Sequence, residues 1–125
     1  MSPWERYKEF EEYLGWLVRS VRPSGWVVGD RSVELAGRPV VVAAIAARSR
    51  VDVANFSKSV LDACEGVLYV TDASVLGVAS VGERGDGART FLGFAQLAPG
   101  ASPGEIADAL AALTAAVTAR FSPGA

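Results

Sequence analysis

The sequence predicts a single α/β or α+β domain in which helices flank one sheet of five to six strands. The chain has 125 residues and half of them are apolar, which is enough to bury one core without disulfides or metals. Helical periodicity is present at both ends and in the middle, and short apolar runs bounded by glycine fill the intervals. We therefore expect the element order α-β-β-β-α-β-β-β-α in one globular domain, residues 1–125, with a frayed tail at 121–125.

The first helix is expected to begin at Ser2 or Pro3, residue types that suit the start of a helix, and to end at Val21, ahead of Pro23. At about 100° per residue, its apolar side chains fall on one arc and its charged side chains on the opposite face. This pattern predicts a helix that lies on a core. The arc consists of Tyr7, Phe10, Leu14, Leu17, Val18 and Val21.

Three aromatic side chains of this helix lie outside the centre of the arc. Trp4 and Tyr13 fall at its borders, where an aromatic ring can be half buried. Trp16 falls in the middle of the charged face. An exposed tryptophan suggests contact with another molecule, so Trp4, Tyr13 and Trp16 are the candidate partner-binding residues.

Three strands are expected next, at 26–29, 33–36 and 39–47, separated by turns that contain glycine. The third reads PVVVAAIAA and shows no alternation of apolar and polar residues. Such a strand is typical of a sheet whose two faces are both covered by helices, so we place 39–47 at its centre. This is also the longest apolar run of the chain, and it is too short to cross a bilayer.

Two further helices have clear boundaries. The second is expected over 52–65, where Asp52 can cap its amino end and Cys64 falls in its apolar stripe. The last helix begins at SPGE, 102–105, which combines a serine cap, a proline at the first helical position and a glutamate at the third. Alanine fills most of its remaining positions, so another backbone could approach it closely.

The remaining strands are expected at 67–71, 75–81 and 90–98, with the first two forming a hairpin and the polar turn 82–89 preceding the last. Their pairing separates two architectures. Parallel pairing of the central strand with 67–71 would favour a nuclease-like plan, whereas an antiparallel meander of the last three strands would favour an interaction module.

The composition excludes several kinds of catalytic site. The chain has no histidine, and its one cysteine, Cys64, lies among apolar residues without a base to form a thiolate. The glycine-rich turn 82–89 lacks the lysine and the following helix of a phosphate-binding loop. We therefore expect no catalytic residue, no cofactor and no metal site. A hydrolase that holds a divalent metal through Asp30 and Asp72 is a third alternative.

Basic residues are concentrated in the middle of the chain. Residues 19–50 contain six arginines and two acids, a charge of +4 (six minus two) within a chain whose net charge is −2. Arg48 and Arg50 follow the central strand, and a loop bearing Arg31 or Arg38 could join them in contacting phosphates. These four arginines are the candidate anion-binding or nucleic-acid-binding residues.

The element order resembles two known architectures. A helix, three strands, a helix and two strands is similar to restriction-like nucleases, but the central strand lacks the Glu-x-Lys ligands of that family. The resemblance therefore implies an inactive subunit. Roadblock, longin and profilin-like domains also flank a sheet with helices, and Trp4-x-x-Tyr7 resembles the opening helix of profilins. That resemblance covers only the general plan.

We therefore expect a non-enzymatic protein-interaction or assembly module that is oligomeric and binds itself, as a homodimer, or another protein. The alternative is a catalytically degenerate nuclease-like or nucleic-acid-binding subunit of a larger complex. Charged residues near the amino terminus predict a cytoplasmic location without membrane contact. Asn, Gln, Met and Cys occur once each and ten of twelve basic residues are Arg, which indicates a thermophilic source, although a G+C-rich genome would also explain the arginines.

Overall fold

A computed structural model describes residues 2–26, 28, 38–85 and 87–121. This part of the chain forms three helices and one mixed sheet of three strands in the order α-β-α-β-β-α, which confirms the α/β class. The prediction of five to six strands is wrong for the described residues. The elements are α1 (Pro3–Val21), β1 (Val40–Arg48), α3 (Val53–Cys64), the short 3₁₀ helix η1 (Asp72–Ser74), β2 (Val75–Arg84), β3 (Arg89–Gln96) and α4 (Pro103–Phe121).

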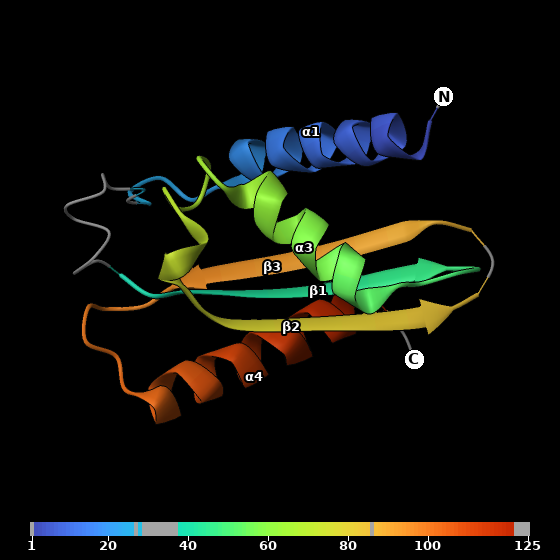
Figure 1. Ribbon diagram of the computed structural model, residues 1–125. Coiled ribbons are helices and arrows are strands. Elements are labelled where there is room, and N and C mark those ends of the chain that lie inside the picture. Colours follow the sequence, from blue (N-terminus) through green and yellow to red (C-terminus); the bar gives the residue numbers. More distant parts are fainter. Residues whose placement is uncertain (1, 27, 29–37, 86, 122–125) are drawn as a thin grey trace.

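The sheet has the order β2-β1-β3, with β1 parallel to β2 and antiparallel to β3. α4 covers one face of the sheet, α3 covers the other, and α1 lies on the outer side of α3 (Figure 1). β1 is buried from Val40 to Ala47, which confirms the prediction of a central strand covered on both faces. No helix in the described ranges has both the length and the apolarity needed to cross a bilayer.

The pleat of β1 divides the core into two clusters. Val42, Ala44 and Ala46 face α3, together with the buried stripe of that helix, whereas Ala43 and Ile45 face α4. The α4 layer packs closely because β3 has a glycine beneath it. A Cβ atom on Gly93 would lie 2.6 Å from Val117 Cγ2, closer than packed atoms allow. The helix therefore rests directly on the strand backbone.

Two of the predicted strands, 26–29 and 33–36, fall mostly outside the described residues. The predicted strand 67–71 is wrong in a different way. Val67, Leu68 and Tyr69 are buried, as their apolar character required, but the segment forms only an isolated bridge between Glu65 and Tyr69. The N–H groups of Val67 and Leu68 both donate to the carbonyl of Cys64, so the chain turns at the end of α3. Burial without alternation is compatible with such a turn as well as with a strand.

The predicted hairpin between 67–71 and 75–81 is consequently absent from the described chain. The parallel neighbour of β1 is β2, which is reached through α3, and β3 lies on the other side of β1. The central strand therefore does not pair with 67–71, as the nuclease-like plan required. The last three predicted strands do not form an antiparallel meander either, as the interaction-module plan required. The strands 75–81 and 90–98 are confirmed as β2 and β3 with shifted ends.

The predicted helix starts are confirmed by their caps. Asp52 accepts a hydrogen bond from the Asn55 N–H at the start of α3. At α4, the Glu105 N–H donates to Ser102 Oγ at 3.2 Å and the Ser102 N–H donates to Glu105 Oε1 at 3.1 Å, the expected reciprocal pair. The prediction of a frayed tail at 121–125 is wrong for Phe121, which belongs to α4 and is buried against Phe91. Residues 122–125 are outside the described chain.

Candidate functional site

The first helix is raised from the sheet by its contact with α3. The two helices approach each other closely at Gly15, because a Cβ atom there would lie 3.0 Å from the carbonyl oxygen of Ala63. Leu14 and Val18 are buried in this contact, as predicted. Leu17 and Val21 were predicted in the same buried arc, but both are exposed, Val21 at 60 %. α3 is narrower than the apolar arc of α1, so one flank of that arc extends beyond it.

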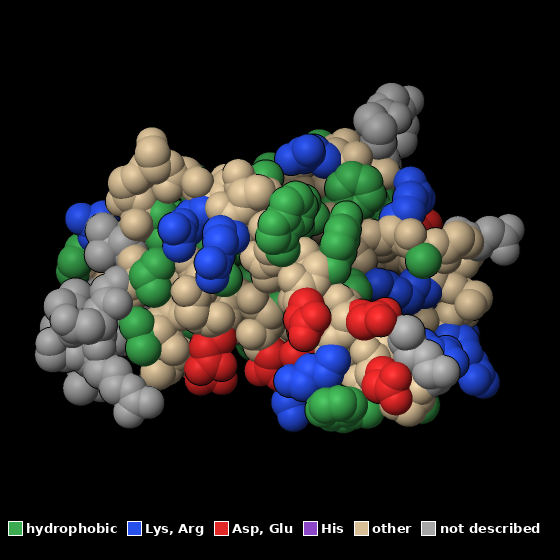
Figure 2. Space-filling view, turned by 90° about the horizontal axis from the view of Figure 1, so that it is seen from above, with side chains coloured by type: hydrophobic (Ala, Val, Ile, Leu, Met, Phe, Trp, Pro, Cys, Tyr) green, Lys and Arg blue, Asp and Glu red, His purple; other side chains and the backbone are tan. Residues whose placement is uncertain are grey.

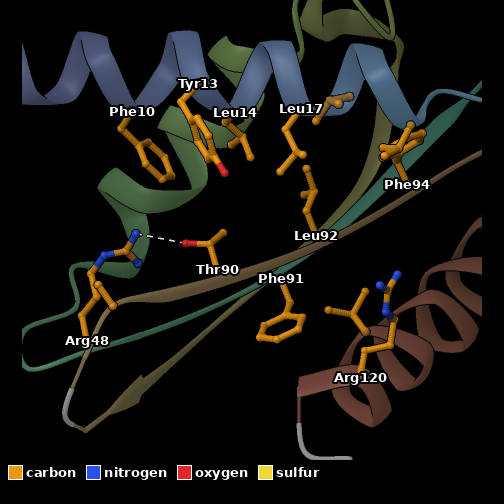
Figure 3. A pocket seen from close by; sticks show the side chains of 14 residues that line it. Phe10, Tyr13, Leu14, Leu17, Arg48, Thr90, Phe91, Leu92, Phe94 and Arg120 are labelled. Carbon is orange, nitrogen blue, oxygen red and sulfur yellow. Dashed lines mark hydrogen bonds between the residues drawn. The ribbon is translucent and has the colours of Figure 1, made fainter.

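This flank forms the roof of a groove of about 580 Å³ between α1 and β3, which we call the α1–β3 groove. Tyr13 and Leu17 point down into it from the helix, and Leu92 points up from the strand (Figure 3). Its lining residues are mainly apolar and come from α1, β1, β3 and the end of α4. They are Phe10, Tyr13, Leu14, Leu17, Val18, Val21, Arg48, Ala88, Thr90, Phe91, Leu92, Phe94, Val117 and Arg120.

The groove is open because β3 is an edge strand. Within the described part of the chain, β3 pairs only with β1, so no strand lies along its outer edge. Thr90 and Leu92 face the α1 layer, because they are paired with Ala46 and Ala44, and Phe91 faces the α4 layer. The groove therefore combines a free strand edge with apolar walls above and below it.

Two arginines supply most of the charge near the groove. Arg48 Nη2 donates a hydrogen bond to Thr90 Oγ1 at 3.0 Å, and its guanidinium lies 5.5 Å from the ring centre of Phe10 and 5.6 Å from that of Phe56. Arg48 thus ties α1, α3 and β3 together. Arg120 reaches the groove from α4, on the opposite side of β3 from α1 (Figure 3).

The three candidate aromatics of α1 are all exposed, but they do not form one site. Tyr13 lines the groove, whereas Trp4 and Trp16 are not among its lining residues. Trp16 is 67 % exposed, which confirms its predicted position on the outer face, and Trp4 is covered in part by Lys8, whose Nζ lies 5.7 Å from the ring centre. Figure 2 views this side of the molecule and shows large hydrophobic side chains among charged ones.

The structure brings together only some of the predicted anion-binding residues. Arg48 and Arg50 lie at the carboxyl end of β1, whereas Arg38 precedes its other end and Arg31 is outside the described chain. Two arginines that the sequence reasoning missed join the first pair. Arg84 is the partner of Arg48 in the parallel register, and Arg89 begins β3 opposite Ala47. Both belong to the segment 82–89 that was predicted as a polar turn, and only the strand order reveals that this segment lies beside the end of β1.

Arg50 and Arg84 line a polar hollow of about 530 Å³ at this end of the sheet, together with Ser49, Val51 and Asp52. The other arginines have intramolecular contacts. Arg48 is hydrogen-bonded to Thr90, and the guanidinium of Arg89 lies 4.8 Å from the ring centre of Phe121. Arg50 and Arg84 are therefore the arginines best placed to contact an external anion.

The catalytic alternatives gain nothing from the geometry. Cys64 is fully buried, and burial raises the pKa of its thiol from 9.0 to about 12, so the thiolate is a minor form at neutral pH. Asp72 is exposed at the amino end of β2, and Asp30 lies outside the described residues. In the described part of the chain, no three Cys, Asp or Glu side chains gather as metal ligands would.

Comparison with known proteins adds no functional assignment. A scan against models of known protein families gives no match to this chain, and no curated protein matches it.

Proposed function

We propose that this chain is a non-enzymatic protein-interaction module that binds an extended segment of another protein in the α1–β3 groove. The observation that carries the proposal is the groove itself, in which the edge of β3 from Thr90 to Phe94, beneath the exposed apolar flank of α1, pairs with no other strand of the described chain. Exposed apolar side chains next to an unpaired edge favour association, because both the apolar surface and the backbone groups gain partners.

The shape of the groove favours an added strand. A segment paired with β3 would point alternate side chains toward the two layers that border the edge. One set would contact Tyr13, Leu17 and Val21 of α1, and the other set would contact Val117 and Arg120 of α4. We therefore expect the bound segment to have apolar residues on the α1 side and an acidic residue on the α4 side, opposite Arg120.

Selection from a displayed library of random ten-residue peptides tests this proposal without requiring the sequence of the partner to be known. We expect the selected peptides to alternate apolar and polar residues, to contain an acid, and to bind with micromolar affinity. Backbone amide shifts on binding should concentrate in β3, near Leu92, and in the adjacent flank of α1. Shifts confined to β2 and α4, or peptides without any alternation, would contradict it.

A matched pair of lysine substitutions sharpens the test. Leu17→Lys places a charge in the groove, so we expect it to weaken peptide binding at least tenfold. Val81→Lys introduces the same charged side chain on β2, whose outer edge is on the other side of the sheet, and should leave binding unchanged. Both residues are exposed, so neither substitution should unfold the protein. Equal binding by wild type and Leu17→Lys would rule out the groove.

A second candidate function is binding of a nucleic acid or another polyanion at the arginine-rich end of the sheet. The observation that favours it is that four arginines lie at the same end of the sheet. Arg48 belongs to β1, Arg84 to β2 and Arg89 to β3, and Arg50 follows β1. Acidic groups at the same end, Glu83 among them, weaken the attraction, so this function ranks second.

Salt dependence distinguishes specific phosphate contacts from weak general attraction. We expect binding of a short RNA or DNA duplex at low salt to weaken with rising salt. Replacing Arg50 and Arg84 together by glutamine should reduce the slope of log K against log salt by about 2, one for each arginine that no longer neutralises a phosphate. Arg38→Gln, at the other end of β1, is the control and should leave the slope unchanged. Absence of binding at low salt would exclude this function.

A further inference from the structure

The other edge strand of the described sheet is β2, and its outer edge has features that suit pairing with β2 of a second copy of this chain. In the described chain β2 pairs only with β1, and its outer edge extends over ten residues. Three apolar side chains on this strand are exposed: Leu76, Val78 and Val81, the last at 46 %. An exposed edge with apolar side chains tends to pair with another strand.

The helix beside this edge leaves room for an added strand. α4 passes over β2 at Gly77, where an added Cβ would lie 3.3 Å from Ile106 Cγ2 and 3.4 Å from Leu110 Cδ2. Beyond that crossing, the flank of α4 and Ala79 border a shallow apolar hollow of about 800 Å³. The helix contributes only Leu, Ala and Thr to it, and no charged residue lines it among the described residues.

We propose that the β2 edge and the adjoining flank of α4 bind a second copy of this chain, so that two three-stranded sheets join into one sheet of six strands through antiparallel β2 pairing. The proposal specifies the self-association that the proposed interaction module would have, and it uses a surface separate from the α1–β3 groove. The two sites face opposite edges of the sheet, so a dimer leaves both grooves accessible.

The sequence of β2 selects one register. With Ala79 opposite its own copy, Val81 lies opposite Gly77 and Val78 lies opposite Ser80, so each exposed valine faces a small residue. Val81 is on the α4 side of the sheet, because it pairs with Ile45, and would enter the hollow beside Leu110. Shifting the centre to Ser80 would instead place Glu83 opposite Gly77, against the apolar flank of α4.

The ends of the strands are compatible with this register. Arg84 of one copy would extend past the start of β2 of the other, toward the 3₁₀ helix η1 that carries Asp72, so opposite charges would approach each other at both ends of the paired strands. The register shift between Val40 and Val41 of β1 places an irregularity near the start of β2. Pairing over residues 77–81 lies beyond this irregularity.

The available area predicts a reversible dimer. The five paired residues extend about 17 Å, and the sheet edge together with the helix layer is roughly 15 to 20 Å wide. The contact would bury on the order of 250 to 350 Å² per copy, well below the ~800 Å² of a standard interface. Association is therefore expected to be weak, with a dissociation constant on the order of 100 µM, within reach of association experiments.

Sedimentation velocity across about 1 to 500 µM tests the proposal. We expect the sedimentation coefficient of the wild-type chain to rise from monomer to dimer over this range. Val81→Lys should raise the dissociation constant at least tenfold, whereas Leu17→Lys, the matched change in the α1–β3 groove, should leave it unchanged. A strict monomer at the highest concentration would overturn the proposal, and so would a dimer that only Leu17→Lys weakens.

Cross-linking checks the register independently. An Ala79→Cys chain should form a disulfide-linked dimer on mild oxidation, because residue 79 faces its own copy. Val78→Cys alone should not, while a mixture of Val78→Cys and Ser80→Cys chains should cross-link. Dimerisation without these cross-links would place the interface elsewhere. If Val81→Lys chains do not dimerise but still bind the selected peptides, then dimerisation and peptide binding in the α1–β3 groove are independent properties.

Discussion

Replacing Tyr69 by alanine is expected to lower the free energy of unfolding by about 3 to 5 kcal/mol, the range for removing a large buried ring. Tyr69 is 1 % exposed and is one of the largest fully buried side chains of the described residues. Its hydroxyl also donates to the Leu61 carbonyl at 2.6 Å, which fixes the segment after α3. For a chain of this length the loss corresponds to a fall in melting temperature of roughly 10 to 20 °C.

Tyr69→Phe separates packing from hydrogen bonding. It keeps the ring but leaves the Leu61 carbonyl without the hydroxyl donor, so we expect a loss of only about 1 to 2 kcal/mol. Both variants can be measured by guanidinium unfolding followed through tryptophan fluorescence. Losses below 1 kcal/mol for the alanine variant would mean that the turn after α3 contributes little to the core.

Stability is also expected to fall steeply in alkali. Burial raises the pKa of Cys64 from 9.0 to about 12, and burial, followed by nearby charges that include Cys64, raises the pKa of Tyr69. The folded chain therefore holds protons that the unfolded chain has released. Below pH 9 the thiol is protonated in both states, and the free energy of unfolding does not depend on its titration. Above pH 9 this free energy decreases by about 1.4 kcal/mol per pH unit, roughly 4 kcal/mol in total by pH 12.

Unfolding titrations between pH 8 and 12 measure this dependence. Cys64→Ala removes the thiol at the cost of a small cavity that does not depend on pH, so its stability should fall less steeply between pH 9.5 and 11.5. The slope that remains above about pH 10 includes the contribution of Tyr69, so it should decrease further in the Cys64→Ala, Tyr69→Phe double variant. Identical slopes in the wild type and in Cys64→Ala would show that the thiol titrates alike in both states.

Several features were predictable because they depend on interactions between residues that are close in the sequence. The starts of α3 and α4 depend on Asp52 and on the Ser102–Glu105 pair, whose partners are three residues away. The absence of polar residues in 39–47 similarly required burial on both faces, whichever elements supplied it. Trp16 could be placed on the outer face of α1 from helical periodicity alone.

The candidate sites were less predictable because they depend on pairing. Nothing local indicates that Arg84 lies beside Arg48, since that contact follows from the parallel register of two strands separated by a helix. Leu17 and Val21 have the spacing of core residues, and the groove exists because α1 contacts α3 at Gly15 and leaves their flank uncovered. The spacing of apolar residues shows which face of α1 is apolar, but it does not show how much of that face another element covers.

The sequence by itself determined the α/β class, the starts of the described helices and the double burial of β1. Only the tertiary structure decided the strand order β2-β1-β3, which leaves two free edges in the described sheet and gives each a different neighbouring helix. The physical reason is that caps and periodicity arise from interactions within one or two helical turns, whereas strand neighbours are chosen by the packing of the whole core.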